Sequence, residues 1–264
     1  MNISSTNNYK IVFFDIDGTL INKDGIIPAT TKEAIRKLKE SKIEVVIASG
    51  RGPSQLNHIA QELELDSFVS LTGSYAVYKG EIIYNQPLPT TSVKQLIEFA
   101  LQYNDPIVYL GSEGVYVSHI EHPHINETFL NWLRLDYPLY LHPTSLEVPI
   151  YQFLLYCPQD REKIYEEQFT DLHFIRWHPL SSEITPRGSS KAKGIEAVLN
   201  HLHISPHEAV AFGDSFNDVE MLSYVGMGIA MGNAHDTVKT FAKFTTKHID
   251  DDGIYYGLKQ IGLI

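Results

Sequence analysis

Short apolar runs alternate with helix-like segments at both ends of this chain, and this alternation constrains the fold more than any other feature. Continuous apolar runs are typical of strands buried on both faces of a parallel sheet. Segments between them place apolar residues at the three- and four-residue spacing of a helix. The strand-like runs lie at 11–14, 44–50, 67–73 and 209–213, and the helix-like segments at 29–41, 56–63 and 190–202. The pattern predicts βαβ units in a doubly wound, mostly parallel α/β sheet.

The middle of the chain has a different pattern. Two β-rich runs at 107–110 and 115–118 are separated by the loop GSEG, which indicates a hairpin. Aromatic residues and proline are dense in the strands and helices predicted after it. We therefore predict a core domain formed by residues 1–83 and 185–264, interrupted by an inserted α+β domain at 84–184.

Composition limits the partners that the chain is expected to bind. The formal net charge is −11, which argues against a nucleic-acid surface. A phosphorylated small molecule would need a local cation to offset repulsion, and a bound metal ion would supply one. The single cysteine, Cys157, excludes an internal disulfide. No membrane-spanning run and no leader pattern is recognisable, so we expect a cytoplasmic protein; the oligomeric state is not predicted.

Polar residues suited to phosphate chemistry follow the predicted strands. In open parallel sheets the ligand crevice lies outside the carboxyl ends of the strands, so these residues are expected to lie together. They are Asp15 and Asp17, Ser49 and Gly50, and Asp214, Asn217 and Asp218, with Lys191 at the start of a helix. The predicted site combines carboxylates, one hydroxyl and one lysine.

This set of residue types points to Mg²⁺-dependent chemistry on a phosphate ester. Carboxylate oxygens suit Mg²⁺, which accepts few protein ligands beside water and substrate phosphate. Lysine supplies a compact charge for the phosphate, and glycine lets backbone amides approach it. Asp15 would be a nucleophile that forms an aspartyl-phosphate, and Asp17 would be the general acid and base. Two close carboxyls tend to separate their pKa values, which suits these different roles.

In this order, the motifs resemble those of the haloacid dehalogenase superfamily of phosphatases. DIDGT at 15–19, Ser49 in ASGR, Lys191, and GDSFND at 213–218 correspond to its four motifs. The insertion resembles a C2-type cap. The segment MGNAHDTVKTFAKFTT, followed by DDGI, resembles the Cof-type branch, subfamily IIB.

The resemblance assigns a role to each motif residue. Asp15 would be the nucleophile and a Mg²⁺ ligand, and Asp17 the acid–base, which also gives its backbone carbonyl to the metal. The other assignments are phosphate binding by Ser49, Gly50, Lys191 and Asn217, and metal binding or support by Asp214 and Asp218. The implied substrate is a small phosphorylated metabolite, such as a sugar phosphate, a nucleotide or a phosphorylated cofactor. The alignment favours Lys191 over the nearby Lys193.

Other functions and local features remain open at this point. A phosphomutase or phosphotransferase of the same superfamily would use the same residues, and a non-catalytic phospho-acceptor sensor would also gather aspartates, a hydroxyl and a lysine. The family's usual Asn-Gly-Ala is replaced by 72–74 (TGS), so the resemblance does not carry over a substrate contact of that Asn to this chain. Asn233 is predicted to cap a helix, with Asp236 three residues on. A metal site in the histidine-rich segment 119–124 is disfavoured.

Overall fold

The computed structural model describes residues 8–142 and 148–264, which divide into two compact units. The first unit comprises Met1–Gly50, His58–Asn85 and Ser190–Ile264, and the second Arg51–Asn57 and Gln86–Ser189. Within the described residues, no helix is both long and apolar enough to cross a membrane. Most of the polar N-terminal segment, for which the sequence predicted no leader, lies outside the described residues.

The first unit is built on a sheet whose central part is parallel, which confirms the predicted α/β class. In sheet order the strands are β14 (Phe244–Thr245), β13 (Met227–Ala230), β12 (Ala209–Gly213), β1 (Ile11–Phe14), β2 (Glu44–Ala48), β3 (Phe68–Ser70), β4 (Tyr75–Tyr78) and β5 (Glu81–Asn85). Pairing is parallel from β14 to β3 and antiparallel from β3 to β5. Strand order therefore reverses around β1, between β2 and β12, which is where an open α/β sheet forms a ligand crevice.

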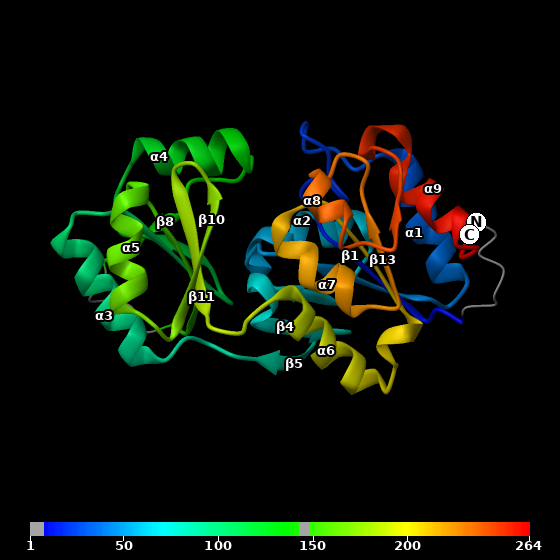
Figure 1. Ribbon diagram of the computed structural model, residues 1–264, viewed down its shortest axis with the longest axis horizontal. Helices are drawn as coiled ribbons and strands as arrows, with labels where there is room; N and C mark the ends of the chain where they lie inside the picture. The colour runs from blue at the N-terminus through cyan, green and yellow to red at the C-terminus, as the bar shows by residue number, and fades with distance from the viewer. Residues whose placement is uncertain (1–7, 143–147) are drawn as a thin grey trace. The chain divides into compact units, whose positions relative to one another are not determined.

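Helices cover both faces of this sheet (Figure 1). They are α1 (Ala29–Glu40), the second half of α2 (Pro53–Leu63), α6 (Lys191–Leu202), α7 (Val219–Tyr224), α8 (Asp236–Lys239) and α9 (Gly253–Gln260). On one face, α6 and α7 bury Ile195 and Met221 against Phe13. The other face carries the stacked rings of Phe14 and Phe212 and is covered by α9. Helix α1 packs against α9. Because β1 and β12 are buried on both sides, their sequences are continuously apolar.

The hairpin of β4 and β5 was not predicted from the sequence, although a signal was present. Lys79 and Gly80 connect the strands with φ values of 49° and 82°. Two central residues with positive φ are typical of a type I′ turn, which matches the twist of a hairpin. This hairpin extends the sheet of the first unit at the β3 edge.

The second unit is an α+β structure with its own sheet. The strand order is β10 (Leu172–His178), β11 (Ser181–Pro186), β9 (Ile150–Leu155), β6 (Ile107–Gly111), β7 (Val115–Val117) and β8 (Leu139–Tyr140). The predicted hairpin is confirmed by the antiparallel pair β6–β7. Helices α3 (Thr90–Gln102) and α5 (Gln159–Gln168) lie side by side on one face, where Phe99 meets Tyr165 edge to face at 5.0 Å (Figure 1). The shorter α4 (Pro123–Asn126) continues into the π-helical segment η2 (Glu127–Trp132).

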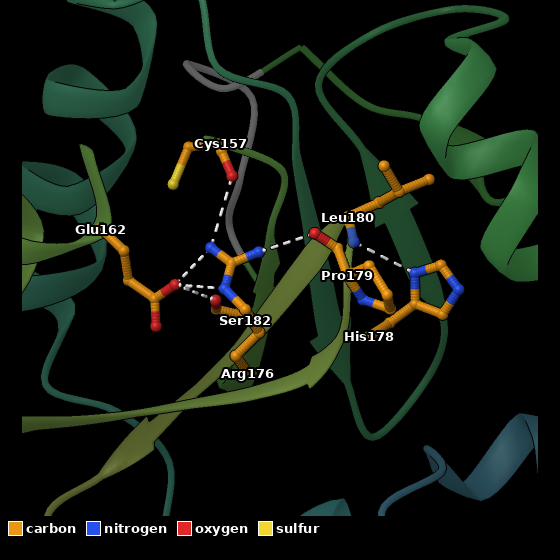
Figure 2. Close-up of polar contacts among 7 residues, drawn as sticks. All are labelled: Cys157, Glu162, Arg176, His178, Pro179, Leu180 and Ser182. Carbon is orange, nitrogen blue, oxygen red and sulfur yellow. Dashed lines mark hydrogen bonds and ion pairs between the residues drawn. The ribbon is translucent and has the colours of Figure 1, made fainter. Parts of the chain in front are cut away.

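An arginine links α5 to the hairpin of β10 and β11 in this unit (Figure 2). The Arg176 guanidinium forms an ion pair with Glu162 and donates to the carbonyl oxygen of Pro179 at 3.0 Å. Ser182 donates to the same Glu162 carboxylate at 2.7 Å. These contacts fix the tip of the hairpin, where His178 Nδ1 accepts the backbone N–H of Leu180 at 3.2 Å.

Candidate active site

The predicted nucleophile lies at the carboxyl end of the central strand of the first unit. Asp15 follows β1 directly, and its backbone N–H donates to the carbonyl oxygen of Phe212 in β12 at 3.0 Å. Because β12, β1 and β2 are parallel neighbours, Asp214, Asp15 and Ser49 follow adjacent strand ends. The sheet therefore brings together residues that are far apart in the sequence.

A buried lysine lies among the carboxylates. Lys191 is the first residue of α6, and its side chain is 1% exposed. Its Nζ donates to Asp15 Oδ1 at 2.5 Å and to Asp218 Oδ1 at 2.6 Å. A buried ammonium group is stable only where it is paired and hydrogen-bonded, and the two carboxylates meet this requirement. Lys193, the neighbouring candidate, is exposed and pairs with Glu196.

The pKa values of the buried groups follow from burial and from these charges. Burial raises the pKa of the Asp15 carboxyl well above its usual range, the Asp218 carboxylate adds to this, and Lys191 opposes both. Burial, with a further contribution from Asp218, raises the pKa of Asp214 to about 7. Burial tends to lower the pKa of Lys191, but Asp15 and Asp218 outweigh it and the pKa is raised. The lysine therefore stays charged while the carboxyls resist ionisation.

Asp214 is held by the loop that follows β1. The hydroxyl group of Thr19 donates to Asp214 Oδ1 at 3.0 Å. Gly18 has a φ of +86°, and a Cβ at this position would lie 2.3 Å from Asp214 Oδ2. Both the backbone conformation and the close approach require glycine here.

Asp218 organises the turn after β12. Its Oδ2 accepts the backbone N–H groups of Asp214 and Ser215, each at 2.9 Å, while its Oδ1 accepts Lys191. The side chain therefore positions both Asp214 and Lys191.

The other predicted site residues also lie in the first unit. Asp17 is exposed, whereas Ser49 is buried and its N–H donates to Val69 at 2.9 Å. Gly50 follows Ser49 at the end of β2. Asn217 Oδ1 is buried and accepts no hydrogen bond from the described part of the chain.

The chain forms a strained turn at the end of β3, which was not predicted from the sequence. Leu71 and Thr72 have φ values of 52° and 48°, which is unusual for a branched residue such as threonine. Gly73 follows with a φ of +87°, and a Cβ there would lie 1.8 Å from the carbonyl oxygen of Ser190. Since Ser190 precedes Lys191, this turn packs directly against the start of α6. Strain of this kind concentrates at functional sites.

The prediction that Asn233 caps a helix is wrong. The N-cap residue of α8 is His235, whose Nδ1 accepts the backbone N–H of Thr237 at 3.2 Å. The Asn233 side chain instead makes two hydrogen bonds to residues distant in the sequence, Gly18 and Ile249.

The described residues contain one group of three side chains that could hold a metal ion. Asp15, Asp214 and Asp218 each offer an oxygen atom, and these atoms lie within 4.8 Å of one another. Asp17, which the sequence also suggested as a metal residue, does not contribute its side chain to this group. The arrangement combines hard oxygen donors, a fixed ammonium group and a buried hydroxyl at one edge of the sheet.

Comparison with known proteins gives consistent results. A family model of haloacid dehalogenase-like hydrolases matches residues 12–258. The chain is 38% identical over 255 residues to the putative phosphatase YkrA of Bacillus subtilis, covering 97% of this chain and 98% of that protein. A solved structure from Geobacillus kaustophilus has a TM-score of 0.90 and 43% identity, covering 97% of this chain and all of the other. The subclass IIB sugar phosphatase BT4131 has a TM-score of 0.87 and 28% identity, with 97% and 100% covered.

Proposed function

Because the chain belongs to the haloacid dehalogenase-like hydrolases, we propose that it hydrolyses small phosphate monoesters with Mg²⁺, through an aspartyl-phosphate on Asp15. The observation that carries this proposal is the position of Lys191, whose Nζ bridges Asp15 and Asp218. It supports the proposal because a fixed positive charge lies beside Asp15, where a phosphoryl group would bind.

The donor set fits a hard divalent cation. Burial and mutual repulsion raise the pKa values of Asp15 and Asp214, and a cation beside them would relieve this repulsion. Both side chains would hold Mg²⁺, together with the backbone carbonyl group of Asp17. Asp218 is better suited to a supporting role, because its oxygens already accept Lys191 and two backbone amides. When bound, Mg²⁺ would neutralise charge on the phosphoryl oxygens.

The first chemical step would transfer the phosphoryl group to the protein. An Asp15 carboxylate oxygen attacks phosphorus while the bond to the leaving oxygen breaks. Asp17 is exposed, which leaves its carboxyl accessible to donate a proton to that oxygen. Lys191 and the Ser49 hydroxyl group would bind the phosphoryl oxygens, and the Asn217 amide would lie near them.

In the second step, water would release the phosphate. Asp17, now ionised, takes a proton from a water molecule, whose oxygen attacks the phosphorus of the aspartyl-phosphate. The bond to Asp15 breaks, and the products are inorganic phosphate and the free carboxylate. Splitting the reaction in this way lowers a very high barrier, since phosphate monoesters hydrolyse extremely slowly without a catalyst.

We propose small phosphorylated metabolites as substrates: sugar phosphates, nucleotides or phosphorylated cofactors. The structural neighbour BT4131 is described as a sugar phosphatase, which supports beginning with sugar phosphates. The net charge of −11 favours a small ester, whose charge a local site can neutralise, over an extended polyanion.

The proposal is tested by measuring phosphate release from a panel of phosphorylated metabolites, with MgCl₂ and with EDTA. We expect Mg²⁺-dependent release that Asp15→Asn lowers by at least about 10³-fold. Asp24→Asn is the matched control, because Asp24 is exposed in the loop after the same strand; it should retain activity. Full activity in Asp15→Asn would contradict the assignment of Asp15 as the nucleophile. No hydrolysis of any ester would contradict the proposal and favour the sensor alternative.

A further inference from the structure

Asn233 joins two backbone segments through its side-chain amide. Its Nδ2 donates to the carbonyl oxygen of Gly18 at 2.8 Å, and its Oδ1 accepts the backbone N–H of Ile249 at 3.0 Å. Gly18 lies in the loop between Asp17 and Thr19, so one end of this bridge lies within the candidate active site.

The backbone that carries Asn233 is itself closely held. The N–H of Gly232 donates to the carbonyl oxygen of Lys247 at 2.9 Å, and that of Ala234 donates to Met231 at 3.0 Å. A Cβ on Gly232 would lie 2.4 Å from the backbone nitrogen of His248. The backbone around Gly232 therefore packs directly against the backbone of Lys247 and His248, and this contact fixes the position of the Asn233 side chain.

The bond to Gly18 acts where small displacements matter. The Gly18 Cα faces the Asp214 carboxylate so closely that a Cβ would overlap it, and the next residue donates to Asp214 Oδ1. A tilt of the peptide group between Gly18 and Thr19 would therefore move the Asp214 contact. It would also move the preceding residue, Asp17, to which we assign the proton transfers.

We propose that Asn233 is a positioning residue that holds the Gly18 peptide, and through it Asp17 and Asp214, in the geometry needed for metal binding and phosphoryl transfer. The inference rests on the proposed function. Partners that orient metal ligands from the next layer typically contribute about 10- to 100-fold to metal affinity or activity. A displacement of about 1 Å at a reacting group has an effect of similar size.

The test separates the two ends of the bridge. Asn233→Asp has the same shape and keeps the acceptor for Ile249 N–H, but it replaces the donor to Gly18 with an oxygen that repels that carbonyl. The matched control is Asn22→Asp. Asn22 Nδ2 donates to Asp250 Oδ1 at 2.8 Å, so it also links the loop after β1 to the segment around residue 250, without touching Gly18.

Two readouts are measured on each folded variant: kcat and KM for an ester that the wild type hydrolyses, and MgCl₂ affinity by isothermal titration calorimetry. We expect Asn233→Asp to lower kcat about 10- to 100-fold with a smaller change in KM, and to weaken Mg²⁺ binding about 10-fold. Asn22→Asp should stay within about twofold in both. Far-UV circular dichroism and the thermal midpoint establish that each variant is folded, and Asn233→Ala provides a neutral second variant.

The outcomes distinguish this inference from the proposed function. If both Asn233 variants bind MgCl₂ and turn over like the wild type, the inference is wrong while the proposed function stands. The inference is equally overturned if their losses only match a loss of folded protein. If the wild type binds MgCl₂ but hydrolyses no ester, the proposed function fails, and weaker binding in Asn233→Asp alone would still support the positioning role.

Discussion

Replacing Lys191 with methionine is expected to destabilise the first unit strongly, and not only to abolish activity. Methionine keeps an unbranched side chain of similar length but removes the ammonium group between Asp15 and Asp218. The side chains of these two carboxylates are 7% and 0% exposed, so water cannot replace the lost partner. Removing one partner from a buried ion pair typically costs about 3–5 kcal/mol.

The structure places this effect toward the lower end of that range and makes it depend on pH. Burial already raises the pKa of Asp15, and loss of Lys191 would raise it further, so the variant can take up a proton and neutralise one carboxylate. Stability that depends on a raised carboxyl pKa is present at low pH and lost as the pH rises. The difference between Lys191→Met and wild type should therefore be largest near pH 8 and shrink toward pH 5.

Urea and thermal unfolding in EDTA, followed by far-UV circular dichroism, measure this difference. A loss of about 3–5 kcal/mol corresponds to a fall of about 6–20 °C in the thermal midpoint. Lys193→Met is the matched control in the same helix; its ion pair with Glu196 is exposed, so it should change stability by less than about 0.5 kcal/mol. The reasoning is refuted if Lys191→Met costs less than about 1 kcal/mol, or if its cost does not become smaller as the pH is lowered from 8 to 5.

Three further predictions concern the turn after β3 and the second unit. Thr72→Asn should raise stability to urea by about 0.5–1 kcal/mol, because asparagine tolerates a φ of 48° better than a branched residue; a loss of stability would contradict this. Burial lowers the pKa of His178, and its Nδ1 accepts the N–H of Leu180, so its contribution to stability should be lost as the pH falls below about 6.5. In unfolding curves at pH 7.5 and 5.5, wild type should therefore lose more stability than His178→Asn, and equal losses would exclude the contribution. Glu162→Gln weakens the ion pair with Arg176 and should lower the free energy of unfolding by about 1–3 kcal/mol. Urea unfolding followed by tryptophan fluorescence measures this, because both tryptophans lie in the second unit, and an unchanged midpoint would show that the ion pair adds no stability.

The sequence was most informative where one local pattern marked both a strand and the polar residues at its end. Buried parallel strands are continuously apolar, so Asp15 and Asp214 stood out at the ends of such runs. The alternation of such runs with helix-like segments predicted the fold class. The rule that ligands bind at the carboxyl ends of parallel strands then predicted where the site lies. The turn at Lys79 and Gly80 carries a signal for the hairpin of β4 and β5, but the alternating strand and helix pattern by itself does not predict that hairpin.

The contacts that hold the site together could not be predicted in the same way. The rule for helix caps considers a few neighbouring residues, and by that rule Asn233 before an acidic residue resembles a cap. Its partner Gly18 is 215 positions away, and only the folded sheet brings the two together. The same holds for Lys191. The segment 189–194 (SSKAKG) contains two lysines among small and polar residues, and nothing in this local pattern indicates that Lys191 is the buried one.

The stability of the site depends on how its positive charge is supplied. Asp15, Asp214 and Asp218 repel one another, and Lys191 alone compensates them only partly, because burial still raises the pKa values of Asp15 and Asp214. A fold that needed only stability would place an apolar residue or an amide at one of these positions. The repulsion is tolerated because backbone donors and Thr19 hold the carboxylates in place. A cation bound between these carboxylates would relieve the repulsion and stabilise the fold, which is what the proposed Mg²⁺-dependent activity requires.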